Sequence, residues 1–112
     1  MLAAKYSKIG LDNEGYLLDP SQWDCDLAQA LADEINITMT DEHWYVVNFV
    51  RNHFEYHQAV PEMRILMKQM KADYGAERAS RKFIYNLFPY GYASQACKIA
   101  GMRKPLKLML DL

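Results

Sequence analysis

The chain has 112 residues, 51% of them hydrophobic, which suffices for one domain with one compact core. No stretch reaches the roughly 18 apolar residues of a membrane span, and the N-terminus lacks the apolar centre of a signal peptide. Two cysteines are too few for a disulfide scaffold. We therefore expect a cytoplasmic protein without membrane contact.

The net charge of −1 conceals two oppositely charged halves. Residues 1–56 carry three Lys or Arg against ten Asp or Glu, whereas residues 57–112 carry ten against four. Two interpretations fit this asymmetry. Either the halves attract each other within the fold, or the basic half binds an acidic partner or a polyanion.

The first elements in chain order are a hairpin and a helix. The stretch "GLDNEG" supplies turn chemistry between two short apolar segments, which predicts a β-hairpin over about residues 5–18. Apolar residues then recur at helical spacing over about 21–34. Pro20 and Ser21 suit the start of that helix.

The clearest helical pattern follows Thr40, which is a good N-cap before two acidic residues. An apolar stripe then runs from Trp44 to Phe54. Pro61 fits the first position of another helix, and Gly75 is a candidate to end it.

Two shorter helices come next. Ser80 is expected to cap a helix over 81–87, and residues 92–100 form the last helix, which Gly101 ends. Residues beyond Gly101 contain a proline and no polar–apolar period.

The domain organisation that follows is a body over residues 1–101 and a C-terminal arm over residues 102–112. The predicted fold class is mainly α, with one N-terminal hairpin.

The centre of the chain is helix-turn-helix-like, with helices expected over 62–73 and 80–88 around a short turn. Arg78, Arg81 and Lys82 lie at the start of the second helix, where a DNA-reading helix places its contacts. The alternative is an ordinary corner between two helices with solvated basic side chains.

Other signs of chemistry are sparse. His53 and His57 have the four-residue spacing of metal ligands, but no third histidine shares their helix face. We expect solvated or partly packed histidines and no metal site. The sequence contains no Gly-rich phosphate loop, nucleophile elbow or CxxC, so we expect no classical active site and no cofactor.

The two cysteines differ in their surroundings. Cys25 lies between two aspartates, which disfavour the thiolate. Cys97 is followed by Lys98, Arg103 and Lys104, whose positive charge would favour it. The alternative for Cys97 is a small residue packed on the apolar side of its helix, and spacing does not decide between the two.

The sequence resembles the DsrC/TusE family of small sulfur-trafficking proteins, which includes the gamma subunit of dissimilatory sulfite reductase. The resemblance runs from Glu14 to Pro105 and lies chiefly in "DEHWYVVNFVRNHFEYHQAVPEMRILMK" and "LFPYGYASQACKIAGMRKP". It implies an orthogonal helical bundle with an N-terminal hairpin, a helix-turn-helix-like centre and a mobile C-terminal arm.

The resemblance also implies a chemistry. In the family a penultimate cysteine on the arm carries sulfur as a persulfide, toward tRNA thiolation in the TusE branch. In the DsrC branch the arm inserts into sulfite reductase, and an upstream cysteine pairs with the terminal one.

This chain departs from the family at the arm. By position Cys97 matches the upstream cysteine, but the carrier position holds Leu108. Tyr92 and Arg103 stand where prolines are usual. The resemblance therefore predicts a retained fold and partner surface with carriage lost. The candidate partner-binding residues are Lys98, Arg103, Lys104 and Leu108.

The leading hypothesis is a sulfur-trafficking protein that acts by protein–protein contact, as a regulatory or non-carrier variant. Its partners would be sulfurtransferase or sulfite reductase proteins. Cys97 is the one candidate for any sulfur transfer. The alternative is a DNA-binding regulator that uses Arg78, Arg81 and Lys82.

Overall fold

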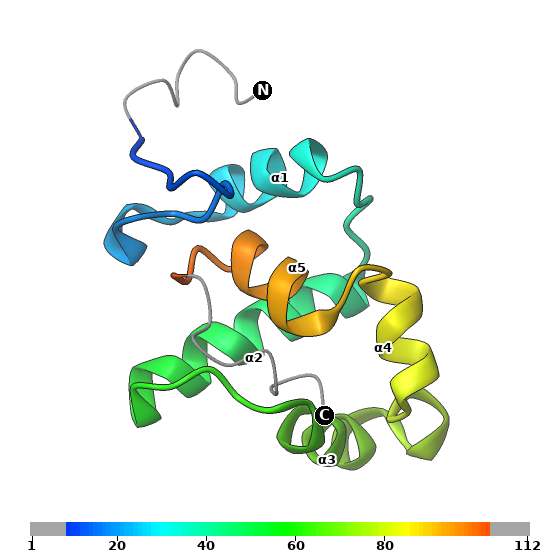
Figure 1. The fold of residues 1–112 in the computed structure, drawn as a ribbon. Helices are drawn as coiled ribbons and strands as arrows, with labels where there is room; N and C mark the ends of the chain where they lie inside the picture. The colour runs from blue at the N-terminus through cyan, green and yellow to red at the C-terminus, as the bar shows by residue number, and fades with distance from the viewer. Residues whose placement is uncertain (1–8, 104–112) are drawn as a thin grey trace.

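The computed structural model describes residues 9–103 (Figure 1). That part of the chain holds five α-helices and two 3-10 turns and contains no named strand, so the mainly α fold class is confirmed. The elements are η2 (Pro20–Gln22), α1 (Cys25–Glu34), α2 (Asp41–His57), α3 (Met63–Tyr74), η3 (Ala76–Arg78), α4 (Arg81–Leu87) and α5 (Tyr92–Ile99). None of these helices is both long and apolar enough to cross a membrane.

The expected N-terminal hairpin is not confirmed. Residues 5–8 lie outside the described residues, and the remainder forms a single isolated antiparallel bridge between Leu11 and Leu17. The Asp12 carboxylate accepts the backbone N–H groups of Glu14 and Tyr16, both at 2.9 Å, and so closes the turn. Local turn chemistry thus acts as predicted.

The first long helix starts later than its pattern indicated. Pro20 and Ser21 form the short turn η2, and α1 begins only at Cys25. The reason is that Trp23 has an extended backbone, while the Asp24 carboxylate accepts the N–H of Leu27 at 2.7 Å and caps the helix.

Helix α2 begins as predicted, since the Thr40 side chain caps it and acidic residues occupy its first turn. Its fully buried residues are Val46, Val47 and Val50. They lie in the main core cluster, so one face of α2 forms a wall of the core.

The middle of the chain has the expected succession of helix, turn and helix. Gly75 ends α3 with a φ of 91°, and Ser80 caps α4. The start of α3 differs from prediction. Pro61 lies before the helix rather than in it, and its carbonyl accepts the Tyr92 hydroxyl at 2.6 Å.

Helix α5 lies at the centre of the fold, packed against α1 and α2 (Figure 1). Its buried residues are Tyr92, Ala93, Gln95, Ala96, Cys97 and Ile99. Small side chains along this face let α5 approach its neighbours closely. Helix α5 therefore forms part of the main core cluster.

Candidate functional site at the C-terminal end of α5

The Cys97 side chain is buried, with 0% exposure, in the main core cluster. Cys25, in contrast, is exposed at the first position of α1. Of the two interpretations of Cys97, the geometry matches the packed small residue. A soluble reagent or a partner thiol has no route to this sulfur while α5 stays packed.

Lys98 is held on the side of α5 that faces the N-terminal turn. Its ammonium lies 4.9 Å from the centre of the Tyr16 ring, a cation–π contact. It also lines a hollow of about 280 Å³ together with Glu14, Gly15 and Glu34. Its contacts therefore tie α5 to the N-terminal turn and α1.

Arg103 is exposed and lies beside the same turn. The pKa of the Asp12 carboxyl is lowered chiefly by the Tyr16 N–H, and the charge of Arg103 contributes to the same shift. The other two candidate partner-binding residues, Lys104 and Leu108, lie outside the described residues, as does most of the expected arm. Met102 still belongs to the core cluster.

The backbone ends α5 with a Schellman motif. The N–H of Gly101 donates to the carbonyl of Lys98 at 3.2 Å, and the N–H of Met102 donates to that of Cys97 at 3.0 Å. Gly101 has a φ of 72°, in the left-handed region that favours glycine. The glycine predicted to end the last helix is confirmed.

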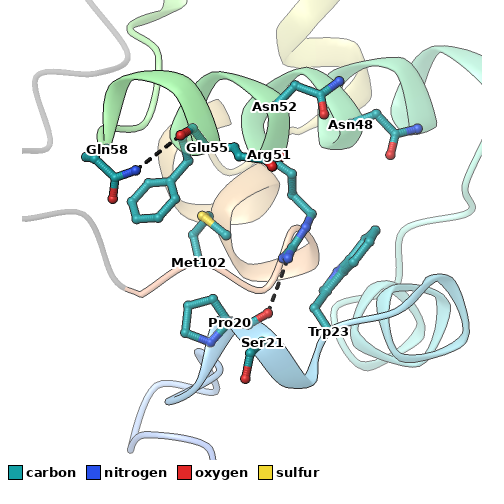
Figure 2. A pocket seen from close by; sticks show the side chains of 10 residues that line it. Pro20, Ser21, Trp23, Asn48, Arg51, Asn52, Glu55, Gln58 and Met102 are labelled. Carbon is teal, nitrogen blue, oxygen red and sulfur yellow. Dashed lines mark hydrogen bonds between the residues drawn. The ribbon is translucent and has the colours of Figure 1, made fainter.

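Two side chains cap the remaining carbonyls at this end. The indole Nε1–H of Trp23 donates to the carbonyl of Ile99 at 2.8 Å, and Nη1 of Arg51 donates to that of Ala100 at 2.6 Å. Nη2 of Arg51 also donates to the carbonyl of Pro20 at 3.2 Å (Figure 2). One guanidinium therefore joins α2, η2 and the end of α5.

Arg51 also stacks on Trp23, with its guanidinium carbon 4.2 Å from the ring centre. Burial lowers the pKa of Arg51, while the nearby Glu55 carboxylate opposes that shift. The pKa of an arginine is high enough that the group stays charged. A permanent positive charge thus sits against the negative end of the α5 dipole.

A hollow of about 510 Å³ opens beside Arg51 (Figure 2). It is lined by Pro20, Ser21, Trp23, Asn48, Arg51, Asn52, Phe54, Glu55, Gln58 and Met102. The lining mixes amides, a hydroxyl and one ion of each sign with aromatic rings. Among the described residues that line it, there is no cysteine and no histidine.

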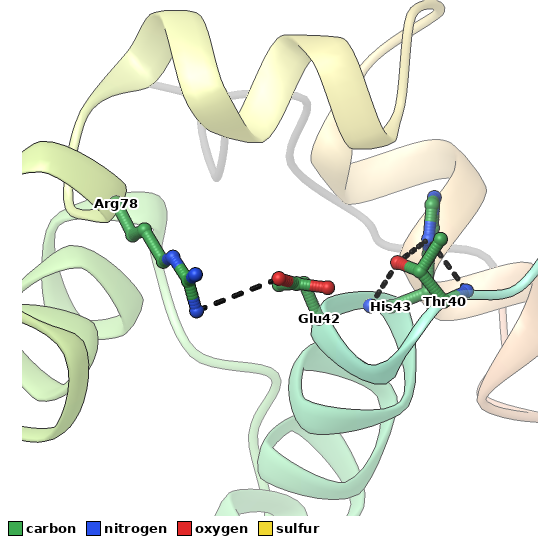
Figure 3. A network of polar contacts seen from close by, with 4 residues as sticks. All are labelled: Thr40, Glu42, His43 and Arg78. Carbon is green, nitrogen blue, oxygen red and sulfur yellow. Dashed lines mark hydrogen bonds and ion pairs between the residues drawn. The ribbon is translucent and has the colours of Figure 1, made fainter.

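Glu42 and His43, at the start of α2, take part in a second set of polar contacts (Figure 3). Nδ1 of His43 accepts the Thr40 N–H at 3.1 Å, so the ring proton is on Nε2, which donates to the Leu87 carbonyl at 2.8 Å. The His43 ring meets Phe88 edge-on at 5.2 Å. His43 thus joins the two family signatures and holds α2 against the corner after α4.

Two of the three residues expected to contact DNA are engaged within the chain. Arg78 forms an ion pair with Glu42 at 3.5 Å (Figure 3). Its guanidinium carbon also lies 5.3 Å from the centre of the Tyr74 ring. Nη1 of Arg81 donates to the sulfur of Met63 at 3.4 Å. Lys82 is exposed.

His53 and His57 lie together on α2, with ring centres 4.3 Å apart. Burial, and then the neighbouring His57, lower the pKa of His53. Over residues 9–103 no three His, Cys, Asp or Glu side chains gather into a possible metal site.

Sequence reasoning missed Trp23, Arg51 and the bridging contact of His43. One signal for Arg51 was present, because it is the only Lys or Arg between Lys8 and Arg64. A single cation in so acidic a stretch suggests that its side chain makes contacts within the fold. Trp23 gave no such signal, since its partner is a carbonyl 76 residues away.

Comparison with known proteins places these observations in a family. Residues 3–109 match the family model described as DsrC like protein. Two curated relatives, from Pectobacterium atrosepticum and Escherichia coli K12, are both named sulfurtransferase TusE. They are 43% and 42% identical over 107 residues, which is 96% of this chain and 98% of each relative.

Solved structures share the fold. The NMR structure of Allochromatium vinosum DsrC is 39% identical with a TM-score of 0.78, and the match covers 88% of both chains. The crystal structure of the oxidised gamma subunit of dissimilatory sulfite reductase (DsrC) from Archaeoglobus fulgidus is 36% identical. Its TM-score is 0.80, and the match covers 87% of this chain and 89% of that one.

Proposed function

Because this chain belongs to the DsrC-like family, we propose that it serves sulfur relay through protein contacts without carrying sulfur on its own arm. The observation that carries the proposal is a family match over nearly the whole chain with leucine, Leu108, where the family's carrier cysteine is expected. The core is family-like, and the reactive end is altered.

The chemistry of sulfur transfer supports a role without sulfur carriage. In a transfer step an acceptor thiolate attacks the outer sulfur of a donor persulfide. A sulfur–sulfur bond forms on the acceptor, the bond in the donor breaks, and the donor leaves as a thiolate. Leu108 offers no thiolate for this step, and the burial of Cys97 leaves it without access to a donor.

The family suggests the partners. The named relatives are sulfurtransferases and subunits of dissimilatory sulfite reductase, so proteins of one of these two systems are the proposed partners. The resemblance associates the first with tRNA thiolation. A cytoplasmic location belongs to the same proposal. DNA binding gains no support, because the relatives named are sulfur proteins and Arg78 and Arg81 make contacts within the chain.

The test of carriage is the mass of the intact protein after incubation with a persulfide donor and a sulfurtransferase. A Cys25→Ser background removes the exposed thiol. The proposal predicts an unchanged mass for this protein, and a gain of one sulfur atom, about 32 Da, when Leu108→Cys is added. A control without the donor should stay unchanged in both variants.

The outcome that would overturn non-carriage is a gain of one sulfur in the Cys25→Ser protein that disappears with Cys97→Ala. The protein-contact half of the proposal is tested separately. Purified sulfurtransferase and sulfite reductase proteins of the host would be passed over the immobilised chain, and retention of neither would contradict it.

A further inference from the structure

The end of α5 is capped more completely than a helix end requires. The last four carbonyls of a helix have no partner within it, and water usually serves some of them. Here all four are occupied. Those of Cys97 and Lys98 accept backbone N–H groups, and those of Ile99 and Ala100 accept Trp23 and Arg51.

We propose that Trp23 and Arg51 are positioning residues that fix the direction in which the chain leaves α5 toward its arm. The inference rests on the proposed function, in which the chain acts through contacts with partner proteins. The two residues touch neither a sulfur nor a substrate. They act through the turn at Gly101 and Met102.

Arg51 is suited to this task by its shape. Two different nitrogens of its planar guanidinium donate to the carbonyls of Ala100 and Pro20. The side chain therefore fixes the end of α5 relative to both α2 and η2. A lysine presents one point charge and cannot hold two carbonyls in fixed directions. Glutamine keeps the polarity but removes the charge and the fork.

Trp23 sets the direction by packing as well as by bonding. A Cβ on Gly101 would lie only 2.4 Å from Cδ1 of the Trp23 ring, so the ring covers the turn on that side. The turn at Gly101 therefore packs directly against the indole. Met102 packs into the core and Arg103 emerges beside the Asp12 turn.

General core packing is the competing explanation. It predicts that removing Arg51 lowers the stability of the whole fold and leaves the turn no more affected than the rest. Positioning predicts a local effect, because openings of the turn cost less free energy than global unfolding. Site-resolved hydrogen exchange separates the two.

The experiment measures amide exchange by NMR in the full chain, comparing the unmodified protein with Arg51→Gln, Arg51→Lys and Asn52→Ala. Asn52 lines the same hollow, is exposed and caps no carbonyl, so it is the matched control. We expect exchange at Gly101 and Met102 to be at least about tenfold faster in Arg51→Gln, as suits the loss of a charge-assisted hydrogen bond. The exchange rates in Arg51→Lys should lie between those of Arg51→Gln and the unmodified protein. Those in Asn52→Ala should match the unmodified protein.

Two results would overturn the proposal. One is unchanged exchange at Gly101 and Met102 in Arg51→Gln, and the other is acceleration by the same factor there and at core amides such as that of Val47. If Arg51→Gln does not fold, Trp23→Phe keeps a ring against Gly101 while removing the indole N–H, and the same local acceleration is expected. No partner is needed, so the result stands apart from that of the sulfur-loading and retention tests.

Discussion

His43 shows at the scale of a single residue how a family signature serves the fold. Its ring accepts the Thr40 N–H and donates to the Leu87 carbonyl, while only 6% of the residue is exposed. No substrate-facing role is needed to explain why histidine stands here. Within this signature, the contacts of His43 are those of a structural residue.

Replacement of His43 by alanine should destabilise the protein by about 2–3 kcal/mol, because it leaves the Leu87 carbonyl unsatisfied and weakens the cap of α2. Urea unfolding followed by circular dichroism would measure the change. Thr40→Ala is the matched control and should cost only about 1 kcal/mol, since it removes the contacts of the hydroxyl with the His43 N–H and ring but keeps the bond from His43 to Leu87. Equal losses in the two variants would show that the contact with Leu87 contributes nothing.

His53 gives a prediction about pH. Its folded-state pKa lies below the ordinary value of 6.5, chiefly because of burial and secondly because of His57. The folded protein thus binds fewer protons at this site, so the stability contribution is complete above pH 6.5 and falls as the pH drops toward the folded pKa. His57→Gln should raise the pKa of His53 only partway, as followed by the ring proton in NMR. Full return to the ordinary value would mean that burial has no effect.

At the scale of elements, sequence patterns within one helix predicted its structure. Contacts between helices could not be predicted from such patterns. Thr40 and Ser80 cap the helices that they were expected to cap, because a cap depends on residues three positions away. The predicted start of α1 was wrong, because Trp23 lies before the helix, where its indole N–H donates to the Ile99 carbonyl. Likewise Pro61 lies outside α3, where its carbonyl meets Tyr92.

Two glycines with similar backbone angles allow the cost of backbone strain to be compared with the cost of steric crowding. Gly15 and Gly101 have φ values of 89° and 72°, but a Cβ on Gly15 would meet only the flexible end of Lys98 at 3.8 Å. Gly15→Ala should therefore cost about 1 kcal/mol, the price of the backbone conformation. Gly101→Ala should cost about 3 kcal/mol or more, because the new Cβ also displaces the Trp23 ring. Equal costs by thermal unfolding would contradict the close packing of that ring.

At the scale of the whole molecule, the sequence predicted the fold class and the family, and both are confirmed. The departure from the family at the arm stays a prediction. It could not place the site, because the residues that cap the end of α5 come from η2 and α2. Their contacts depend on a tertiary arrangement that no periodicity encodes. The charge near Cys97 was visible in the sequence, but the direction of Lys98 toward Tyr16 was not.

The same arrangement makes the reactivity of Cys97 a property of the whole fold. Cys97 has no exposed surface and lies in the core that α1, α2 and α5 share, whereas Cys25 is exposed. A thiol reagent should thus modify Cys25 quickly and Cys97 at least about a thousandfold more slowly, since an opening of the core must come first.

Peptide mass mapping of alkylated protein over time would give both rates, and Cys25→Ser would isolate that of Cys97. Destabilisation by His43→Ala should speed the modification of Cys97 and leave that of Cys25 unchanged, because only the first requires the core to open. Comparable rates for the two thiols in the folded protein would show that the end of α5 opens by itself. Cys97 would then regain the access that a sulfur acceptor needs.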